Sequence, residues 1–288
     1  MATYLLITNP ISSRGLGEKG IAEVTALFEA RGARIDVHRT RGAGDARSVV
    51  ADRHGAYDAV IAAGGDGTIG EVVNGLAGAP VPVGVLPRGT ANVLAKELAL
   101  PREMPDAADV ILRGKTKKFD LGVADGKRFV LMASAGYDAQ VVALAHESRG
   151  AKFGYTSYVA PILKALAAGD FPEIRVKADG REYACRHVIV ANVENYGGPM
   201  RPARGAKHDD GLFDVVMYTR HGRLSVARYA FAAFLGRTAS RSDVIRVQAS
   251  KVTLSSERPV ALQLDGDPAG SLPRTLEVLP AGMTVIVP

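Results

Sequence analysis

An aspartate lies within a glycine turn that otherwise has the features of a phosphate-binding loop. Gly64-Gly65-Asp66-Gly67-Thr68 follows the apolar run 59–63 and precedes a helical pattern over 69–76. Glycines allow positive φ and let backbone N–H groups approach an anion, and the helix N-terminus adds partial positive charge. Asp66 would repel phosphate unless it holds Mg²⁺ or meets a hydroxyl that is being deprotonated. The alternative is that Asp66 and Thr68 only cap the helix.

The first third of the chain alternates strand and helix patterns, which predicts a parallel sheet wrapped by helices. The expected strands are 4–8, 34–38, 59–63 and 81–86, and the expected helices are 17–30, 44–54 and 93–98. Ligands of such sheets bind at the carboxyl ends of the strands. The turns at 9–13, at Thr40, at Asp66 and at 88–92 are therefore expected to converge on one nucleotide.

Beyond residue 122 the pattern changes to short strands with Asp-Gly turns at 125, 179, 210 and 265. Such turns between β-rich runs predict an antiparallel sandwich or barrel. The expected strands are 128–133, 174–178, 182–191, 213–219, 244–254, 260–264 and 275–287, with helices at 139–146, 155–168 and 223–235. We therefore expect an α/β domain over 1–122 and a β-rich domain over 123–288.

The helical stretch 223–235 has two interpretations. Its apolar residues Leu224, Ala227, Phe231, Phe234 and Leu235 fall near one face, with arginines around it. This pattern is compatible with a helix on a membrane surface. It is equally the pattern of an ordinary helix packed on a sheet, which is the commoner case.

Composition narrows the functional classes. The single cysteine, Cys185, excludes an internal disulfide, and no apolar stretch is long enough to span a bilayer. The N-terminus lacks a signal-peptide pattern, so we expect a soluble, cytosolic protein. A net charge of +6 favours anionic partners, but the absence of a basic run and of Trp disfavours nucleic acid. None of the six histidines has metal-ligand spacing.

Several segments together resemble the bacterial diacylglycerol kinase and lipid kinase family, whose catalytic domain is shared with sphingosine and ceramide kinases. The resemblance spans nearly the whole chain. It rests on Asn9-Pro10, Thr40, the stretch 64–75 from the first glycine turn to Asn74-Gly75, the stretch 86–92 (Leu-Pro-Arg-Gly-Thr-Ala-Asn), the stretch 209–214 (Asp-Asp-Gly-Leu-Phe-Asp) and Asp265-Gly266-Asp267.

The resemblance implies roles for these residues. The nucleotide-binding set for ATP would be Asn9, Thr40, Gly64, Gly65, Asp66, Gly67, Thr68, Ile69, Gly70 and Thr90. Asp265 would accept the proton of a lipid hydroxyl, with Asp66 helping to place metal and hydroxyl, unless Asp265-Gly266 is only a hairpin turn. Asp210 and the backbone carbonyls of Lys207 and Leu212 would hold Mg²⁺, and Asp120 corresponds to a family acid.

Three positions depart from the family pattern. Val93 stands where many members have Asp after the Gly-Thr-Ala-Asn turn, which removes one carboxylate from the expected metal network. Gly70 replaces a common Asn, and Asp267 replaces a Glu.

The leading hypothesis is an ATP-dependent lipid kinase. The first domain would hold Mg·ATP and the second a lipid alcohol such as diacylglycerol or a sphingoid lipid, with peripheral contact to an anionic membrane at its inner face. A homodimer remains open. The alternatives are NAD kinase chemistry, since that superfamily shares the Gly-Gly-Asp-Gly turn, or a nucleotide or lipid sensor without turnover, for which Val93 is the main argument.

Overall fold

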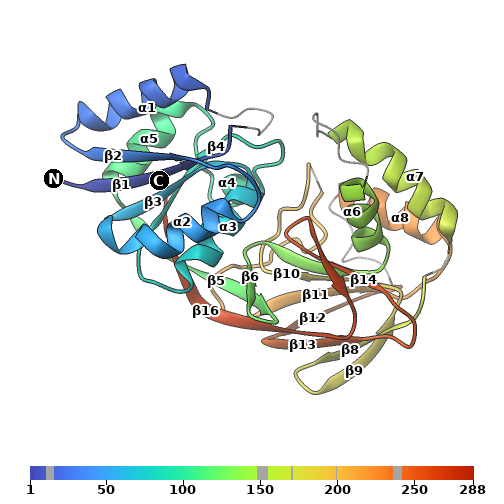
Figure 1. Ribbon diagram of the computed structural model, residues 1–288. Helices are drawn as coiled ribbons and strands as arrows, with labels where there is room; N and C mark the ends of the chain where they lie inside the picture. Colours follow the sequence, from blue (N-terminus) through green and yellow to red (C-terminus); the bar gives the residue numbers. More distant parts are fainter. Residues whose placement is uncertain (11–15, 148–154, 170, 199, 236–241) are drawn as a thin grey trace. The chain divides into compact units, whose positions relative to one another are not determined.

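The computed structural model describes residues 1–10, 16–147, 155–169, 171–198, 200–235 and 242–288. The chain divides into two compact units (Figure 1). Unit 1 consists of residues 1–119 together with 281–288, and unit 2 of residues 120–280. The last eight residues, 281–288, thus belong to unit 1, whereas the sequence pattern placed them in the second domain.

Unit 1 contains the expected parallel sheet. Its strands lie in the order β2-β1-β3-β4, and the end of the long strand β16 pairs beside β4. The bounds are β1 (Thr3–Thr8), β2 (Arg34–Arg39), β3 (Ala59–Gly64), β4 (Val83–Pro87) and β16 (Arg274–Ile286). Strand β1 has β2 on one side and β3 on the other, so the strand order reverses there. In sheets of this type a ligand binds beyond the carboxyl ends at such a reversal.

Helices cover both faces of this sheet (Figure 1). α1 and α5 contact each other on one face, and α2 and α3 contact each other on the other. The bounds are α1 (Glu18–Glu29), α2 (Asp45–Arg53), α3 (Asp66–Leu76), α4 (Val93–Glu97) and α5 (Met104–Arg113), with a short 3₁₀ helix at His54–Ala56. The sequence pattern did not predict α5. Its buried Ile111 packs against Gly84, where a Cβ would lie only 3.1 Å from the Ile111 side chain.

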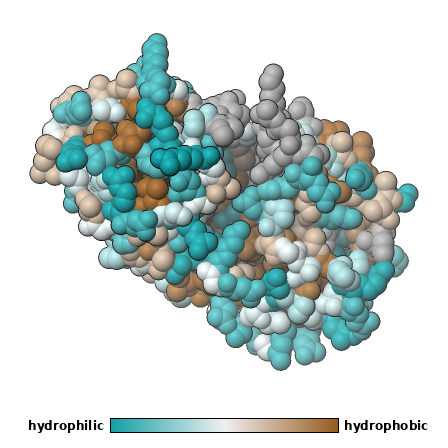
Figure 2. Space-filling model, viewed as in Figure 1, coloured by the Kyte–Doolittle hydropathy of each residue, from teal (hydrophilic) through white to brown (hydrophobic). Residues whose placement is uncertain are grey.

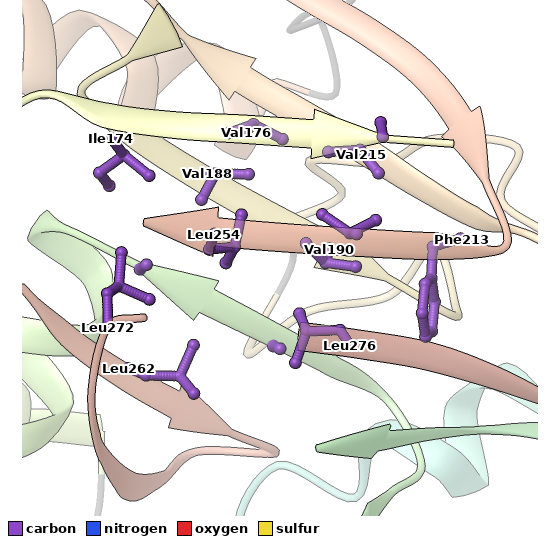
Figure 3. Close-up of a cluster of buried hydrophobic side chains, with 14 of the residues drawn as sticks. Ile174, Val176, Val188, Val190, Phe213, Val215, Leu254, Leu262, Leu272 and Leu276 are labelled. Carbon is purple, nitrogen blue, oxygen red and sulfur yellow. The ribbon is translucent and has the colours of Figure 1, made fainter. Parts of the chain in front are cut away.

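Unit 2 is the expected antiparallel sandwich. One sheet contains β5 (Thr116–Ala124), β6 (Lys127–Phe129), β8 (Ile174–Ala178), β9 (Arg181–Cys185), β13 (Lys251–Ser255) and the first part of β16. The other has the order β12-β11-β10-β7-β14-β15, with bounds Val244–Ala249, Phe213–Tyr218, His187–Ala191, Met132–Ala135, Ala261–Leu264 and Asp267–Ser271. Side chains of both sheets meet in one core, among them Val176 and Leu254 from the first and Val188 and Val215 from the second (Figure 3).

Three stretches expected to be single strands are each two strands in different sheets. The chain leaves one sheet for the other between Phe129 and Met132, at Arg186 and at Ser250, so the expected strands 128–133, 182–191 and 244–254 are wrong as continuous elements. A strand that crosses between the layers of a sandwich keeps its β pattern on both sides of the crossing. The pattern therefore carries no mark of the crossing.

Three of the four Asp-Gly turns are two-residue hairpin turns. At Asp125-Gly126, Asp179-Gly180 and Asp265-Gly266 both residues have positive φ, between 42° and 88°. A two-residue turn with positive φ at both positions has a backbone twist that matches the twist of the two antiparallel strands it connects. The fourth, Asp210-Gly211, is not a hairpin turn, because it only precedes β11.

The side chain of Asp179 stabilises one of the sheet crossings. Its carboxylate accepts N–H bonds from Ser250 and Lys251, both at 2.9 Å, where the chain passes from β12 to β13. Desolvation raises the pKa of Asp179, but these N–H bonds outweigh it and hold the pKa below its usual value. The carboxylate thus satisfies backbone donors that neither sheet can use.

Three helices complete unit 2: α6 (Tyr137–Glu147), α7 (Val159–Ala168) and α8 (Arg223–Phe234), with a 3₁₀ turn at Tyr155–Tyr158. α6 packs on β7, β14 and β15, and α7 contacts both α6 and α8. Within the described residues, no helix has the length and hydropathy that a membrane span requires.

Candidate active site

The turns expected to bind nucleotide share one edge of the unit 1 sheet. Thr8 pairs with both Arg39 and Ala63, and Gly64 pairs with Pro87, so the four parallel strands end together. The residues that follow these strand ends include Asn9, Thr40, Gly65 and Arg88. These positions therefore lie at one edge of the sheet, as expected, while residues 11–13 of the first turn lie outside the described residues. That they bind one nucleotide stays a prediction.

The glycines of the first turn are required for close approach of two backbones. Gly65 lies against Gly89, and a Cβ on Gly89 would come within 2.4 Å of the Gly65 Cα atom. A Cβ on Gly64 would meet the Thr68 side chain at 2.4 Å. None of Gly64, Gly65 and Gly67 has a positive φ, and Gly65 is extended at φ −93°. The expectation that this turn needs glycine for positive φ is therefore wrong.

Gly67 and Gly70 have no such structural reason. Both lie in the first turns of α3, neither has a positive φ, and a Cβ on either would find no protein atom within 4 Å. Glycine inside a helix costs roughly 1 kcal/mol relative to alanine. These two positions leave open space beside the helix N-terminus, at the same edge as the converging turns. The fold does not account for glycine there, whereas a closely approaching ligand would.

Asp66 caps a helix other than its own. Its two carboxylate oxygens accept the N–H groups of Val93 and Leu94, both at 3.1 Å, at the start of α4. Burial raises the pKa of Asp66, and the bonds from Val93 and Leu94 oppose that rise. The capping alternative holds in altered form: the carboxylate joins the turn after β3 to the helix after β4. No side-chain cap is present at the start of α3 itself.

The turn before α4 is fixed by Asn92. This residue has φ 47°, and its side chain accepts the Gly89 N–H at 2.7 Å and donates to the Gly89 carbonyl at 2.9 Å. Val93 then begins α4 with its side chain 5% exposed. At the position where the family pattern led us to expect a carboxylate, this chain therefore has a packed side chain, and the backbone N–H of Val93 donates to Asp66.

Other residues of the glycine motif have structural functions. Gly75 is required because a Cβ would lie 2.6 Å from the Arg47 carbonyl of α2. Glu71 accepts the Gly44 N–H at 2.9 Å and so caps α2. Ile69 is only 2% exposed, so of its atoms the backbone is what remains for ligand contact. Thr40 is buried and Thr90 is exposed.

Asp265 lies in the hairpin turn between β14 and β15 of unit 2. Its carboxylate accepts N–H bonds from Val130 at 2.6 Å, Leu131 at 2.8 Å and Met132 at 3.0 Å, where the chain passes from β6 to β7. This arrangement repeats that of Asp179: the same turn type, with the carboxylate on a sheet crossing. The hairpin alternative and a chemical role are thus compatible, because the turn holds a carboxylate in one fixed place.

A second carboxyl group, which sequence reasoning missed, is linked to the Asp265 turn. Asp138, at the start of α6, accepts hydrogen bonds from the hydroxyls of Ser134 and Tyr196. The Gln263 amide donates to Ser134 at 2.9 Å and accepts the Gly266 N–H at 2.7 Å, so the network ends in the catalytic-candidate turn. Burial raises the pKa of Asp138, against the effect of its hydroxyl partners. These residues share no motif spacing that could have indicated them.

The expected metal turn is held in place by a buried acid. Asp120 accepts the Gly211 N–H at 2.7 Å, and its own N–H donates to the His208 carbonyl at 2.8 Å. One oxygen of Asp210 accepts the Leu212 N–H at 3.1 Å. Among the described residues no group of three or more His, Cys, Asp or Glu side chains is arranged to hold a metal ion. A site here would therefore depend on backbone carbonyls, as the predicted set of Lys207, Asp210 and Leu212 does.

Comparison with known proteins gives a consistent result along the whole chain. Residues 3–124 match the diacylglycerol kinase catalytic domain, and residues 131–287 match the YegS C-terminal NAD kinase beta sandwich-like domain. A diacylglycerol kinase of Mycobacterium tuberculosis is 32% identical, with the alignment covering 98% of this chain and 94% of that protein. The chain belongs to the diacylglycerol kinase family.

Two further proteins named as diacylglycerol kinases are also similar to this chain along almost its whole length. The diacylglycerol kinase of Bacillus subtilis is 30% identical over 98% of this chain and 95% of its own. The crystal structure of a diacylglycerol kinase from Bacillus anthracis superposes with a TM-score of 0.75 at 21% identity, covering 100% of this chain and 97% of that one. The resemblance and the α/β plus β-sandwich fold class are confirmed, and the protein is a lipid kinase by family.

The raised pKa of Asp138 gives this kinase a pH-dependent stability. A carboxyl group with a higher pKa in the folded state binds more protons there than in the unfolded state, so stability falls as pH rises from the unfolded pKa of about 3.9 towards the folded one. Asp138→Asn removes this titration. We expect the free energy of unfolding of the wild type, relative to the variant, to decrease across that range in urea titrations at several pH values. A constant difference, or one of opposite slope, would contradict the raised pKa.

Proposed function

We propose that this member of the family is an ATP-dependent lipid kinase that transfers the γ-phosphate to the hydroxyl of a lipid alcohol such as diacylglycerol or a sphingoid lipid. Unit 1 binds the nucleotide and unit 2 the acceptor. The lipid oxygen attacks the γ-phosphorus, the bond from that phosphorus to the bridging oxygen of ADP breaks, and the hydroxyl proton passes to a carboxylate.

The observation that carries the nucleotide proposal is the open space at Gly67 and Gly70. Both glycines weaken a helix that they do not help to pack, beside the N-terminus of α3 and the end of β3. A phosphate group at this place would meet backbone N–H groups and the positive end of the helix, with no Cβ in between. Asn9, Thr40 and Thr90 come from the neighbouring strand ends or turns and complete the proposed ATP-binding set.

Asp265 is the proposed proton acceptor. Three N–H bonds hold its carboxylate in a defined orientation. Phosphoryl transfer needs positioning more than base strength, because the hydroxyl loses its proton as the bond to phosphorus forms. Asp66 would help to hold the metal ion on the phosphates, and its carboxylate also accepts two N–H groups at the start of α4.

Magnesium is proposed in two functions. One ion would neutralise the phosphates of ATP, which phosphoryl transfer requires. A second, structural ion would bind Asp210 with the carbonyls of Lys207 and Leu212, a mixed set of hard oxygen ligands that suits Mg²⁺. The N–H bonds from Leu212 to Asp210 and from Gly211 to Asp120 fix this turn.

The lipid acceptor determines where in the cell the enzyme acts. A lipid alcohol with long chains stays in the bilayer, so the enzyme is proposed to be cytoplasmic and to bind peripherally to the anionic inner membrane face. The net charge of +6 favours that contact.

Gly67→Ala tests the nucleotide site. The structure has room for the added methyl group and alanine favours a helix, so we expect the free energy of unfolding to stay equal or rise slightly. A methyl group in the path of the phosphates should weaken ATP binding by at least about tenfold, or about 1.4 kcal/mol, measured by calorimetry with Mg·ATP. Gly55→Ala, at another position with open space, is the matched control and should bind ATP normally. Equal affinity in both variants would place the nucleotide elsewhere.

An acceptor panel tests the reaction. Labelled phosphate from Mg·ATP should appear on one or more lipid alcohols in mixed micelles, with diacylglycerol, a sphingoid base, ceramide and phosphatidylglycerol offered separately. NAD serves as the control acceptor and should stay unlabelled. Labelled NAD would transfer the protein to NAD kinase chemistry. ATP binding without any labelled product would favour a sensor, for which the replacement of a carboxylate by Val93 would be the structural reason.

A further inference from the structure

Exposed hydrophobic side chains of this kinase gather on two neighbouring helices. Apart from Met1, the exposed large hydrophobic residues among the described ones are Val159, Ile162 and Leu163 on α7, Leu224 and Phe231 on α8, and Leu235 directly after α8. Figure 2 shows hydrophobic residues at the outer surface of unit 2 where Figure 1 shows α7. We call these six residues the α7–α8 surface.

Packing inside unit 2 does not explain why these six residues are apolar. On α7, Pro161 and Ala165 face inward and are buried, whereas Leu163 is 60% exposed. On α8, Val226 and Tyr229 are buried, whereas Phe231 is 64% and Leu224 is 74% exposed. Each helix therefore has an inner face that packs and a second, apolar face towards solvent. Exposed apolar side chains that gather on neighbouring helices indicate an interaction site.

The charged residues that α7 and α8 themselves carry are all cationic, while Glu147 of α6 lies near Lys164. Neither α7 nor α8 contains an Asp or Glu, while Lys164, Arg223 and Arg228 are exposed on them. Arg228 falls between Leu224 and Phe231 on the same stripe of α8. Arg223 also donates a hydrogen bond to the Ala167 carbonyl of α7, which ties the two helices together.

Apolar side chains with cations among them suit an anionic lipid bilayer. The apolar residues enter the boundary of the acyl chains, and the long lysine and arginine side chains reach the headgroup phosphates. A second copy of the chain fits less well, because a twofold contact through this surface would place cations against cations. We propose that the α7–α8 surface docks this kinase on the anionic face of a membrane. The inference rests on the proposed function only in that the acceptor would be a bilayer lipid.

Vesicle sedimentation without ATP tests the docking surface separately from catalysis. The wild-type protein should bind vesicles of phosphatidylcholine with about one third phosphatidylglycerol, bind pure phosphatidylcholine vesicles less, and be released by salt. Leu163→Ser combined with Phe231→Ser should weaken binding at least tenfold. Arg228→Glu should also weaken it, whereas Lys19→Glu, the same charge change on exposed α1, should have a smaller effect.

Two further measurements separate the outcomes. All variants should unfold at the wild-type temperature, because the substituted side chains are exposed, and should keep wild-type turnover on a short-chain acceptor that is soluble in water. Vesicle binding that is unchanged in the double serine variant would overturn the proposal. So would a wild-type dimer in sedimentation velocity that the double variant converts to monomer. A failure of turnover in the wild type would instead count against the proposed function alone.

Discussion

Backbone N–H groups need acceptors where the chain begins a helix or leaves a sheet, and in this protein acidic side chains supply several of them. Asp66 caps α4, Glu71 caps α2, and Asp179 and Asp265 accept the N–H groups at two sheet crossings. Buried backbone donors without partners are rare in folded proteins because each one lowers stability. The turns of both units are therefore held by carboxylates that lie far away in the sequence.

This constraint changes how the motif acids are understood. Asp66 and Asp265 are the acids for which we propose catalytic roles, and both carboxylates accept backbone N–H groups. Such bonds do not conflict with chemistry, because a phosphoryl-transfer site gains from charges fixed before the substrate arrives. The same bonds mean that loss of activity after substitution can arise from a displaced turn as well as from a missing charge.

Local patterns made much of the fold predictable. The parallel sheet follows from alternating strands and helices, and the hairpins at 125, 179 and 265 follow from Asp-Gly pairs that tolerate positive φ. The sheet crossings at Arg186 and Ser250 were not predictable, because strand pattern is blind to which layer a strand joins. The Asp66 cap was not predictable because Asp66 and Val93 lie 27 positions apart. The Asp138 network was not predictable because its residues belong to no motif, and Asp138 and Tyr196 lie 58 positions apart.

The most direct test compares the stability and the activity of Asp265→Asn with those of Asp179→Asn, the same substitution at an equivalent hairpin turn. Both residues occupy the same turn type and bind backbone at a sheet crossing, so both variants should lose a similar amount of stability, on the order of 1 kcal/mol in urea unfolding. Phosphate transfer to the lipid acceptor should fall by about 100-fold or more in Asp265→Asn alone, with ATP binding unchanged. Equal activity in the two variants would contradict a chemical role for Asp265 and would mean that this residue only stabilises the fold.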